Sequence, residues 1–271
     1  MYIVCYEDNV YRVFNGYSIY RKFIVYSVQI VFTICRVYKV YNGKNVHNVF
    51  NKQSKIMRNN ILFTNIKGGV GKTSCCALFA QYLCENGYPV KVLDADIQAS
   101  LSRHRERELA ANPDAVIPWE VSTVDTTDRQ SLQSSIEEAM KFDGIVLFDM
   151  PGTLNAANLD LLYKAADLAV VPISYDFDTI DATGIFIKVI KRVKDIQLVF
   201  LPNRINTTEN RADDMKQREE TVKILGRIGR VTPRIKQSVV IKRYSTISAL
   251  DKYQKAAVEH AFNAIIEHIK L

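Results

Sequence analysis

The chain has 271 residues and five cysteines, but no C-x-x-C pair. Cys75 and Cys76 are adjacent in the sequence, and neighbours on a helix cannot form a disulfide without distortion. We therefore expect reduced thiols in a cytosolic protein, with Cys75, Cys76 and Cys84 acting as small hydrophobic side chains. The spacing also disfavours an iron–sulfur site.

The first 56 residues contain no Ala, Leu or Pro, although Ala and Leu are among the commonest residues of globular domains. This segment holds eight of the 14 Tyr, and it carries eight Lys/Arg against two Asp/Glu. The other 215 residues hold 28 Lys/Arg and 27 Asp/Glu, so most of the net charge of +7 belongs to the segment and does not by itself indicate nucleic acid. We therefore divide the chain into an atypical segment, 1–56, and one domain, 57–271.

Three explanations of segment 1–56 stay open. Met57 directly precedes the first expected strand, so translation could begin there and 1–56 would be upstream sequence read in frame. The dominance of Val, Ile and Tyr favours a genuine β-rich extension. The third explanation is a membrane segment at 23–35. That run has 13 residues, whereas a spanning helix needs about 20, and it lacks the small-residue cleavage site of a signal peptide.

The most informative motif is a glycine-rich loop that follows an apolar run at 61–66 and precedes a helical pattern at 75–84. Glycines let backbone N–H groups converge on phosphate oxygens, and the helix that follows adds its positive end. This is the deviant phosphate loop, K-G-G-x-G-K-[ST], with a second lysine at its start. The loop consists of Lys67, Gly68, Gly69, Val70, Gly71, Lys72, Thr73 and Ser74. Lys72 would contact the β- and γ-phosphates of a nucleotide, and the Thr73 hydroxyl would ligate Mg²⁺.

Strand and helix patterns alternate along the rest of the domain. A cap at Thr126-Thr127-Asp128 predicts a helix that ends at Met140, and Gly87 stands where the first helix should end. The alternation predicts an α/β fold with a doubly wound, mostly parallel sheet flanked by helices on both faces. The expected strands are 89–94, 119–124, 144–149, 168–173 and 196–201, and the last helix is 250–269.

Three aspartates fall at the ends of expected strands, where parallel sheets bind their ligands. Asp149 ends an apolar strand before Pro151-Gly152, a Walker-B pattern in which the aspartate helps to hold Mg²⁺. Asp94 and Asp96 end the strand that follows the first helix. We predict Asp96 as a functional residue, and Asp94 either as part of the metal site or as a residue that orients this loop.

The loop at 67–74, the segment 94–98 and the turn 149–152 together resemble the ParA/MinD family of ATPases, over about residues 58–271. The resemblance implies that two subunits enclose two ATP molecules with Mg²⁺. Lys67 would then reach the nucleotide of the partner subunit, while Lys72 would contact the nucleotide of its own subunit.

The same resemblance implies roles for three further residues. Asp96 would position the attacking water, Asp149 would hold the metal shell, and Asn203 would contact adenine. The family usually has proline after the second aspartate of the 94–98 segment, whereas this chain has Ile97, which leaves the loop freer.

A basic stretch from 221 to 250 contains seven Lys/Arg and no Asp/Glu. Such a surface neutralises DNA phosphates without sequence preference, although it could also be a solvated face. ParA-type proteins bind DNA nonspecifically through this part of the chain when they are ATP-bound dimers. The expected DNA-binding residues are Arg234, Lys236, Lys242 and Arg243. Val239, Val240 and Ile241 are expected to be buried beside them.

The predicted function is therefore a partition-type ATPase that acts in the cytoplasm on the nucleoid and is slow until an adaptor protein stimulates it. One alternative is a MinD-like ATPase with a membrane-binding C-terminal helix, and another is a nucleotide-gated binding module with negligible hydrolysis. The tyrosine-rich tail of kinases with a related fold is absent. The apolar stripe from Val258 to Ile269 indicates a core-facing helix, so we expect no membrane association.

Overall fold

A computed structural model describes residues 2–7, 10–15, 59–206 and 212–269. The chain divides into two compact units, residues 1–55 and 56–271. In the first unit, β1 (Tyr2–Glu7) pairs antiparallel with β2 (Val10–Asn15). The apolar run 23–35 lies outside the described residues. In the part of the chain that is described, no helix is long and apolar enough to cross a membrane.

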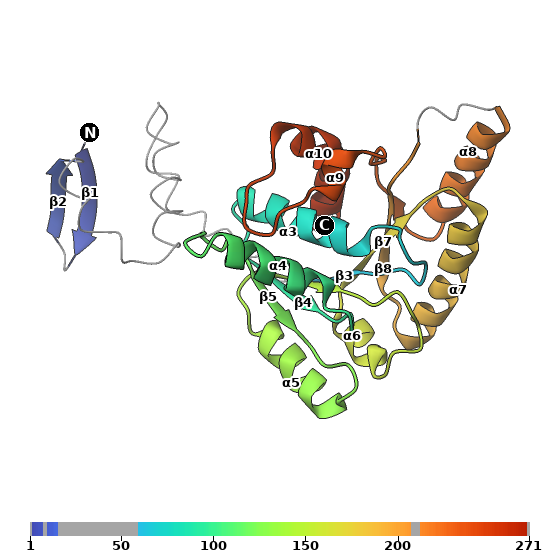
Figure 1. Cartoon of the computed structure of the whole chain (residues 1–271), viewed down its shortest axis with the longest axis horizontal. Helices are drawn as coiled ribbons and strands as arrows, with labels where there is room; N and C mark the ends of the chain where they lie inside the picture. The colour runs from blue at the N-terminus through green and yellow to red at the C-terminus, as the bar shows by residue number, and fades with distance from the viewer. Residues whose placement is uncertain (1, 8–9, 16–58, 207–211, 270–271) are drawn as a thin grey trace. The chain divides into compact units, whose positions relative to one another are not determined.

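The second unit is built on one seven-stranded sheet whose neighbouring strands are all parallel (Figure 1). Its spatial order is β5-β4-β6-β3-β7-β8-β9, so β3 lies at the centre. The strands are β3 (Asn59–Phe63), β4 (Val90–Asp94), β5 (Glu120–Thr123), β6 (Ile145–Asp149), β7 (Leu168–Ile173), β8 (Gln197–Pro202) and β9 (Arg230–Val231). The predicted doubly wound α/β fold is confirmed.

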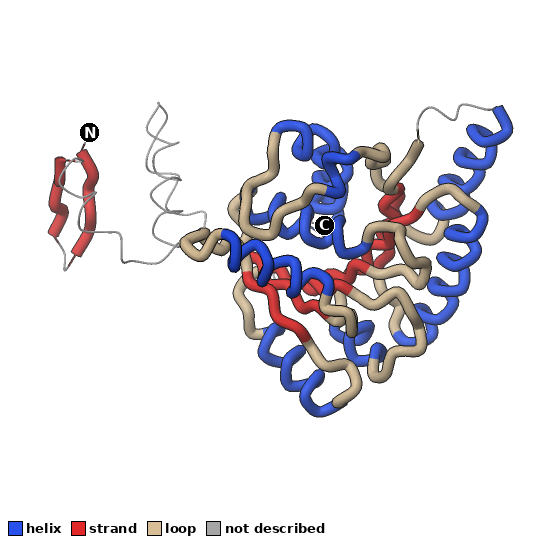
Figure 2. Tube along the Cα trace, viewed as in Figure 1, coloured by secondary structure: helices blue, strands red, loops and turns tan. Residues whose placement is uncertain are grey.

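Helices cover both faces of this sheet (Figure 2). Side chains alternate along β3, so Ile61 and Phe63 join one apolar core and Leu62 joins the other. The first core is covered by α3 (Lys72–Glu85), α4 (Ser100–Ala111), α9 (Val239–Lys242) and α10 (Lys252–Ile269). The second is covered by α5 (Arg129–Met140), α6 (Leu159–Ala165), α7 (Phe177–Val193) and α8 (Ala212–Gly226).

Local sequence signals account for several helix ends. Gly87 has φ +81° and donates its N–H to the Cys84 carbonyl, which ends α3 as predicted. The Asp128 side chain accepts hydrogen bonds from the first turn of α5, which confirms the predicted cap. The apolar stripe of α10 is buried against the first core, and this confirms a core-facing helix.

The cysteines of α3 are buried and unpaired, as the sequence predicted. Burial raises the pKa of the Cys75 and Cys84 thiols to about 12, so both stay protonated at neutral pH. These side chains therefore contribute packing rather than chemistry.

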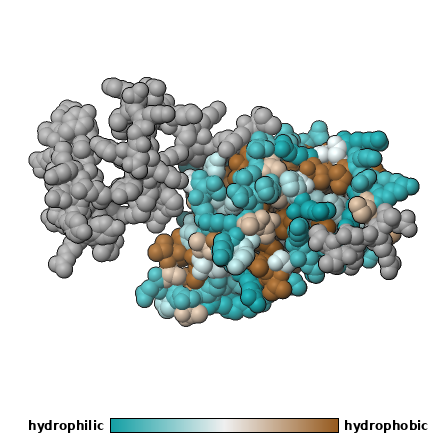
Figure 3. Space-filling model, turned by 90° about the horizontal axis from the view of Figure 1, so that it is seen from above, coloured by the Kyte–Doolittle hydropathy of each residue, from teal (hydrophilic) through white to brown (hydrophobic). Residues whose placement is uncertain are grey.

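The described surface, seen from above, mixes hydrophilic residues with separate apolar patches (Figure 3). The most exposed large apolar side chains are those of Ile97, Val116 and Phe177. Single apolar residues on a surface are common and do not require a partner.

Candidate functional site

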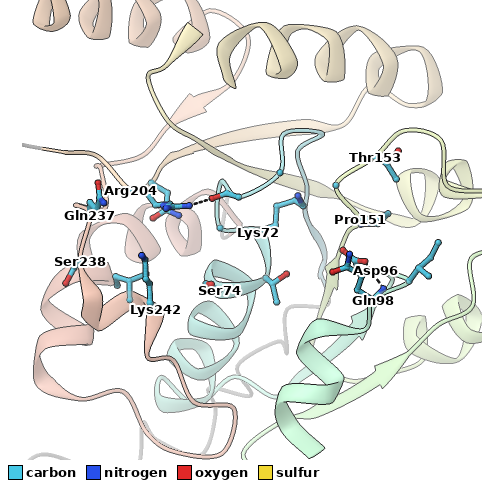
Figure 4. A pocket seen from close by; sticks show the side chains of 18 of the residues that line it. Lys72, Ser74, Asp96, Gln98, Pro151, Thr153, Arg204, Gln237, Ser238 and Lys242 are labelled. Carbon is cyan, nitrogen blue, oxygen red and sulfur yellow. Dashed lines mark hydrogen bonds between the residues drawn. The ribbon is translucent and has the colours of Figure 1, made fainter. Parts of the chain in front are cut away.

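A pocket of about 680 Å³ lies where the loops after β3, β4, β6 and β8 meet the segment that leads into α9 (Figure 4). Parallel sheets bind ligands at this edge, because the loops there face a common crevice. The lining residues are Gly68, Gly69, Gly71, Lys72, Thr73, Ser74, Asp96, Ile97, Gln98, Pro151, Gly152, Thr153, Asn203, Arg204, Lys236, Gln237, Ser238, Ile241 and Lys242.

The glycine-rich loop has the geometry that phosphate binding needs. Gly69 has φ +78° and Gly71 has φ +92°, a region that side chains with a Cβ rarely adopt. Helix α3 begins at Lys72, directly after Gly71, so its free N–H groups lie beside the pocket. Val70 does not line the pocket, because its side chain is buried in the protein.

Lys72 is the buried cation of the pocket (Figure 4). Desolvation lowers the pKa of Lys72, while the nearby carboxylates of Asp149 and Asp96 raise it. A Cβ atom on Gly152 would lie 3.2 Å from Lys72 Nζ, so glycine leaves room for this ammonium group. The geometry suits contact with a phosphate that enters from the loop side.

Lys67 is placed differently from Lys72, although both were predicted as catalytic. Its side chain does not line the pocket, and its Nζ lies 3.2 Å from Asp178 Oδ2 in the first turn of α7. Its backbone N–H donates to Asn65 Oδ1 at 3.1 Å. The structure therefore does not bring the Lys67 ammonium group into the pocket of its own chain.

Asp149 is fully buried beneath the pocket at the end of β6. Desolvation and the neighbouring carboxylates of Asp94 and Asp96 raise the pKa of Asp149 to about 8, against the opposing effects of Thr73 and Lys72. The Thr73 hydroxyl is close enough to lower this pKa, yet neither oxygen of Asp149 has a hydrogen bond of regular geometry among the described residues. A buried carboxylate without partners suits a bound cation or its water shell.

Asp94 is also fully buried, but its oxygens are already used. Oδ2 accepts from the Ser102 N–H at 2.9 Å, and Oδ1 accepts from the Asp96 N–H at 3.3 Å. Asp94 does not line the pocket. These contacts favour the orienting role over the metal-ligand role among the two that the sequence left open.

Asp96 lines the pocket near the start of the loop between β4 and α4, where Asp94 accepts its backbone N–H. Its Oδ1 accepts from the Gln98 N–H at 2.9 Å, a bond visible in Figure 4. Ile97 lines the same pocket and is 75% exposed, so the residue that replaces proline is mostly in solvent. Asp96 can thus face a reacting phosphate from a partly exposed position.

Asn203 packs directly against the glycine-rich loop. Its Nδ2 donates to the Val70 carbonyl at 2.8 Å, and a Cβ on Gly71 would lie 2.4 Å from that nitrogen. Its Oδ1 is buried without a hydrogen-bond partner among the described residues. Arg204, with φ +58°, donates from its guanidinium group to the Gly69 carbonyl. Asn203-Arg204 falls where the resemblance places an adenine contact, but only Asn203 was predicted as a site residue, and no local pattern predicts that Arg204 contacts the loop.

The basic segment from Arg234 to Arg243 is divided by the structure. Lys236 and Lys242, which were predicted to bind DNA, line the pocket, whereas Arg234 and Arg243 do not. The expectation that 239–241 is buried was wrong for Val239, which is 60% exposed, although Ile241 is buried. A four-residue helix there turns only one side chain inward. Gln237 and Ser238 also line the pocket, and sequence reasoning missed both.

Solved structures share this fold, whereas a comparison with curated protein sequences finds no match. A putative plasmid partition protein of Borrelia burgdorferi B31 bound to AMPPNP has 16% identity and a TM-score of 0.60, covering 78% of this chain and 99% of that chain. A chain of the Aquifex aeolicus MinC:MinD cell division protein complex has 17% identity and a TM-score of 0.59, covering 79% of this chain and 96% of that chain. Cobyrinic acid a,c-diamide synthase of Mycobacterium smegmatis with bound ADP and magnesium has 18% identity and a TM-score of 0.56, covering 79% of this chain and 96% of that chain.

Identities this low establish a common fold and nothing finer. The family model of the CobQ/CobB/MinD/ParA nucleotide binding domain, however, matches residues 61–239. That range is more than half of the chain and contains the glycine-rich loop, the three strand-end aspartates and Asn203. The protein therefore belongs to the CobQ/CobB/MinD/ParA family of nucleotide-binding domains.

Proposed function

We propose that the protein binds and hydrolyses ATP with Mg²⁺ and that its ATP-bound dimer binds DNA nonspecifically, as a partition ATPase. The observation that carries the nucleotide part is the pocket itself. Backbone N–H groups of the glycine-rich loop and the Lys72 ammonium group face one cavity, which also has a neutral amide, Asn203, in its wall. A triphosphate would lie on the loop, and Asn203, which lines the pocket, would contact the adenine.

The residues present fit a magnesium ion. Among the described residues, no three His, Cys, Asp or Glu side chains cluster to hold a metal by themselves. Mg²⁺ commonly takes one or two protein oxygens together with waters and phosphate oxygens, and here Thr73 would supply a hydroxyl and Asp149 would bind the water shell. The ion would neutralise phosphate charge.

Hydrolysis would depend on Asp96 and two lysines. Asp96 would orient the attacking water, and Lys72 would stabilise the charge on the phosphates. Lys67, which lies outside its own pocket, would supply a second positive charge to the nucleotide of a partner subunit. The relatives bound to AMPPNP and to ADP with magnesium support this choice of ligand.

The DNA part of the proposal rests on uncompensated charge. Among the described residues, none of Arg234, Lys236, Lys242 and Arg243 forms a salt bridge, and all four are exposed. The apolar stripe of α10 is buried, so this helix offers no apolar face to a lipid surface. These observations favour a DNA partner over a MinD-like membrane partner. An adaptor that stimulates hydrolysis would act on the nucleoid-bound dimer.

The test is DNA binding by an Arg234→Glu/Arg243→Glu variant. Both residues lie outside the nucleotide pocket, so the change leaves the ATP site intact. With Mg²⁺ and AMPPNP at low salt, we expect at least about tenfold weaker binding to random duplex DNA, because four charges per dimer reverse sign. Fluorescence anisotropy measures this affinity.

The matched control is Lys141→Glu/Lys191→Glu, which reverses the charge of two exposed lysines elsewhere. The control should bind DNA as the unchanged protein does. Equal affinity of the two variants, with dimerisation preserved, would contradict the DNA face. Measuring ATP turnover with and without DNA separates an active ATPase from a binding module with negligible hydrolysis.

A further inference from the structure

Lys67 contacts helix α7 directly through its side chain and indirectly, by way of Asn65, through its backbone. Buried Asn65 donates from Nδ2 to the Pro172 carbonyl at 2.9 Å and to Thr183 Oγ1 of α7 at 3.0 Å. Asn65 Oδ1 in turn accepts the Lys67 N–H. The Lys67 side chain then reaches Asp178 Oδ2 on the same helix, at 3.2 Å. The position of the start of the glycine-rich loop is therefore fixed by contacts with the first two turns of α7.

The carboxylate that receives Lys67 sits on a well-defined helix start. Asp176 caps α7 by accepting the Thr179 N–H at 2.9 Å, and the Ser174 hydroxyl donates to Asp176. Thr179 is buried, so this turn is anchored in the protein. Asp178 itself points outward with 81% of its side chain exposed, and the Lys67 side chain is 37% exposed. A fixed backbone thus presents a solvent-facing carboxylate to Lys67.

This contact competes with the role that the proposed function gives to Lys67. A lysine that serves the nucleotide of a second subunit must leave Asp178 first, because one ammonium group cannot occupy both places. The phosphates of a nucleotide carry several negative charges and attract the ammonium group more strongly than one exposed carboxylate does. An exposed pair is weak enough to break, yet it still biases where the lysine lies.

We propose that Asp178 is a positioning residue that retains Lys67 within its own subunit until a second, nucleotide-loaded copy of the chain draws it away. This inference rests on the proposed function, since it needs Lys67 to act across a dimer. Asp178 would raise the protein concentration at which the ATP-bound dimer forms.

The expected size follows from the strength of exposed ion pairs. Releasing one such pair costs a factor of about two to five in an equilibrium constant. A symmetric dimer releases two such ion pairs, so the dimerisation constant should change by the square of this factor, about 4- to 25-fold. Salt screens the pair, so the effect should shrink as ionic strength rises.

The experiment compares Asp178→Asn with Asp181→Asn, which removes the same charge from an exposed position one turn later on α7. Sedimentation velocity with Mg²⁺ and AMPPNP gives the dimerisation constant of the full chain. We expect Asp178→Asn to dimerise about 4- to 25-fold more tightly at low salt, with Asp181→Asn and Asp178→Glu close to the unchanged protein. In a Lys67→Ala background, Asp178→Asn should have no effect, because there is no lysine to release.

Several outcomes would overturn the inference while leaving the proposed function standing. These are equal constants for the two asparagine variants, weaker dimerisation of Asp178→Asn, or a shift that persists in the Lys67→Ala background. Unimpaired dimerisation and hydrolysis by Lys67→Ala alone would instead remove the trans role of Lys67. A wild-type chain that stays monomeric with Mg²⁺ and AMPPNP would remove the dimer and this inference together.

Discussion

The two ends of the nucleotide pocket hold positive charge in different ways. At the phosphate end, Lys72 is buried between the glycine-rich loop and the 151–152 turn, close to Asp149 and Asp96. At the opposite end, Lys236 and Lys242 line the pocket from an exposed segment. Buried charges interact strongly and tolerate little change, whereas exposed charges act weakly and additively. The first end should therefore decide whether a nucleotide binds, and the second should only adjust how tightly.

The largest effect should come from removing the buried cation. Lys72→Ala deletes the ammonium group that faces the phosphates in a partly desolvated site, so we expect ATP affinity to fall at least about 100-fold. Isothermal titration calorimetry with Mg²⁺ and ATP measures it, and Lys91→Ala, a lysine on β4 outside the pocket, is the control. Tight binding by Lys72→Ala would mean that the phosphates do not lie on this loop.

An intermediate effect should appear when the buried carboxylate is neutralised. Asp149→Asn removes a charge that burial disfavours, and we expect the nucleotide-free protein to gain on the order of 1–3 kcal/mol in free energy of unfolding. The same variant should bind Mg²⁺–ATP more weakly, because the water shell of the ion loses its anion. A rise in stability paired with a loss of binding would mark Asp149 as functional.

The sign of the pH dependence provides the check. The pKa of Asp149 is about 8 in the folded chain, well above the ordinary value of 3.8 that it has in the unfolded chain. Between these two pH values the folded chain keeps a proton on Asp149 that the unfolded chain has lost. Stability consequently falls as pH rises across this window, and asparagine removes that loss. Thermal melts in EDTA should show almost no gain near pH 4 and the largest gain above pH 8. Asp195→Asn, on an exposed loop, should show no such gain, and a gain independent of pH would exclude the buried carboxylate as the cause.

The smallest effect should separate two adjacent basic residues. Lys242 lines the pocket and Arg243 does not, so Lys242→Gln should weaken ATP binding by a few fold and Arg243→Gln should leave it unchanged. The loss should diminish at high salt, because the side chain is exposed. Calorimetry at two salt concentrations measures both variants. Equal ATP affinities of the two variants would mean that Lys242 does not contact the nucleotide, so that its charge would be available for DNA.

How far the sequence predicted this molecule depends on the range of the contacts. The end of α3 at Gly87, the cap of α5 at Asp128 and the buried stripe of α10 follow from residues within a few positions of one another, and all three predictions were confirmed. The inner strands β6, β7 and β8 were recognised because both faces of a parallel sheet are covered there, which makes each of them a nearly continuous apolar run. The two-residue strand β9 was not predicted. Val239 was misassigned because a short apolar run does not reveal which side chains a single helical turn exposes.

By itself, the sequence determined the α/β class, the glycine-rich loop and the strand-end position of the three aspartates, because each depends on local backbone preference and apolar periodicity. Only the tertiary structure decided what those residues contact. Asn203 closes over Gly71, and Arg204 over Gly69, across more than 130 positions of chain. Lys67 meets Asp178 across 111 positions. β8 lies two strands from β3 in the sheet. The chain that follows β8 comes back to the same edge of the sheet, and this places Lys242 in the pocket. Such pairings arise from strand order and packing, for which neighbouring residues carry no signal.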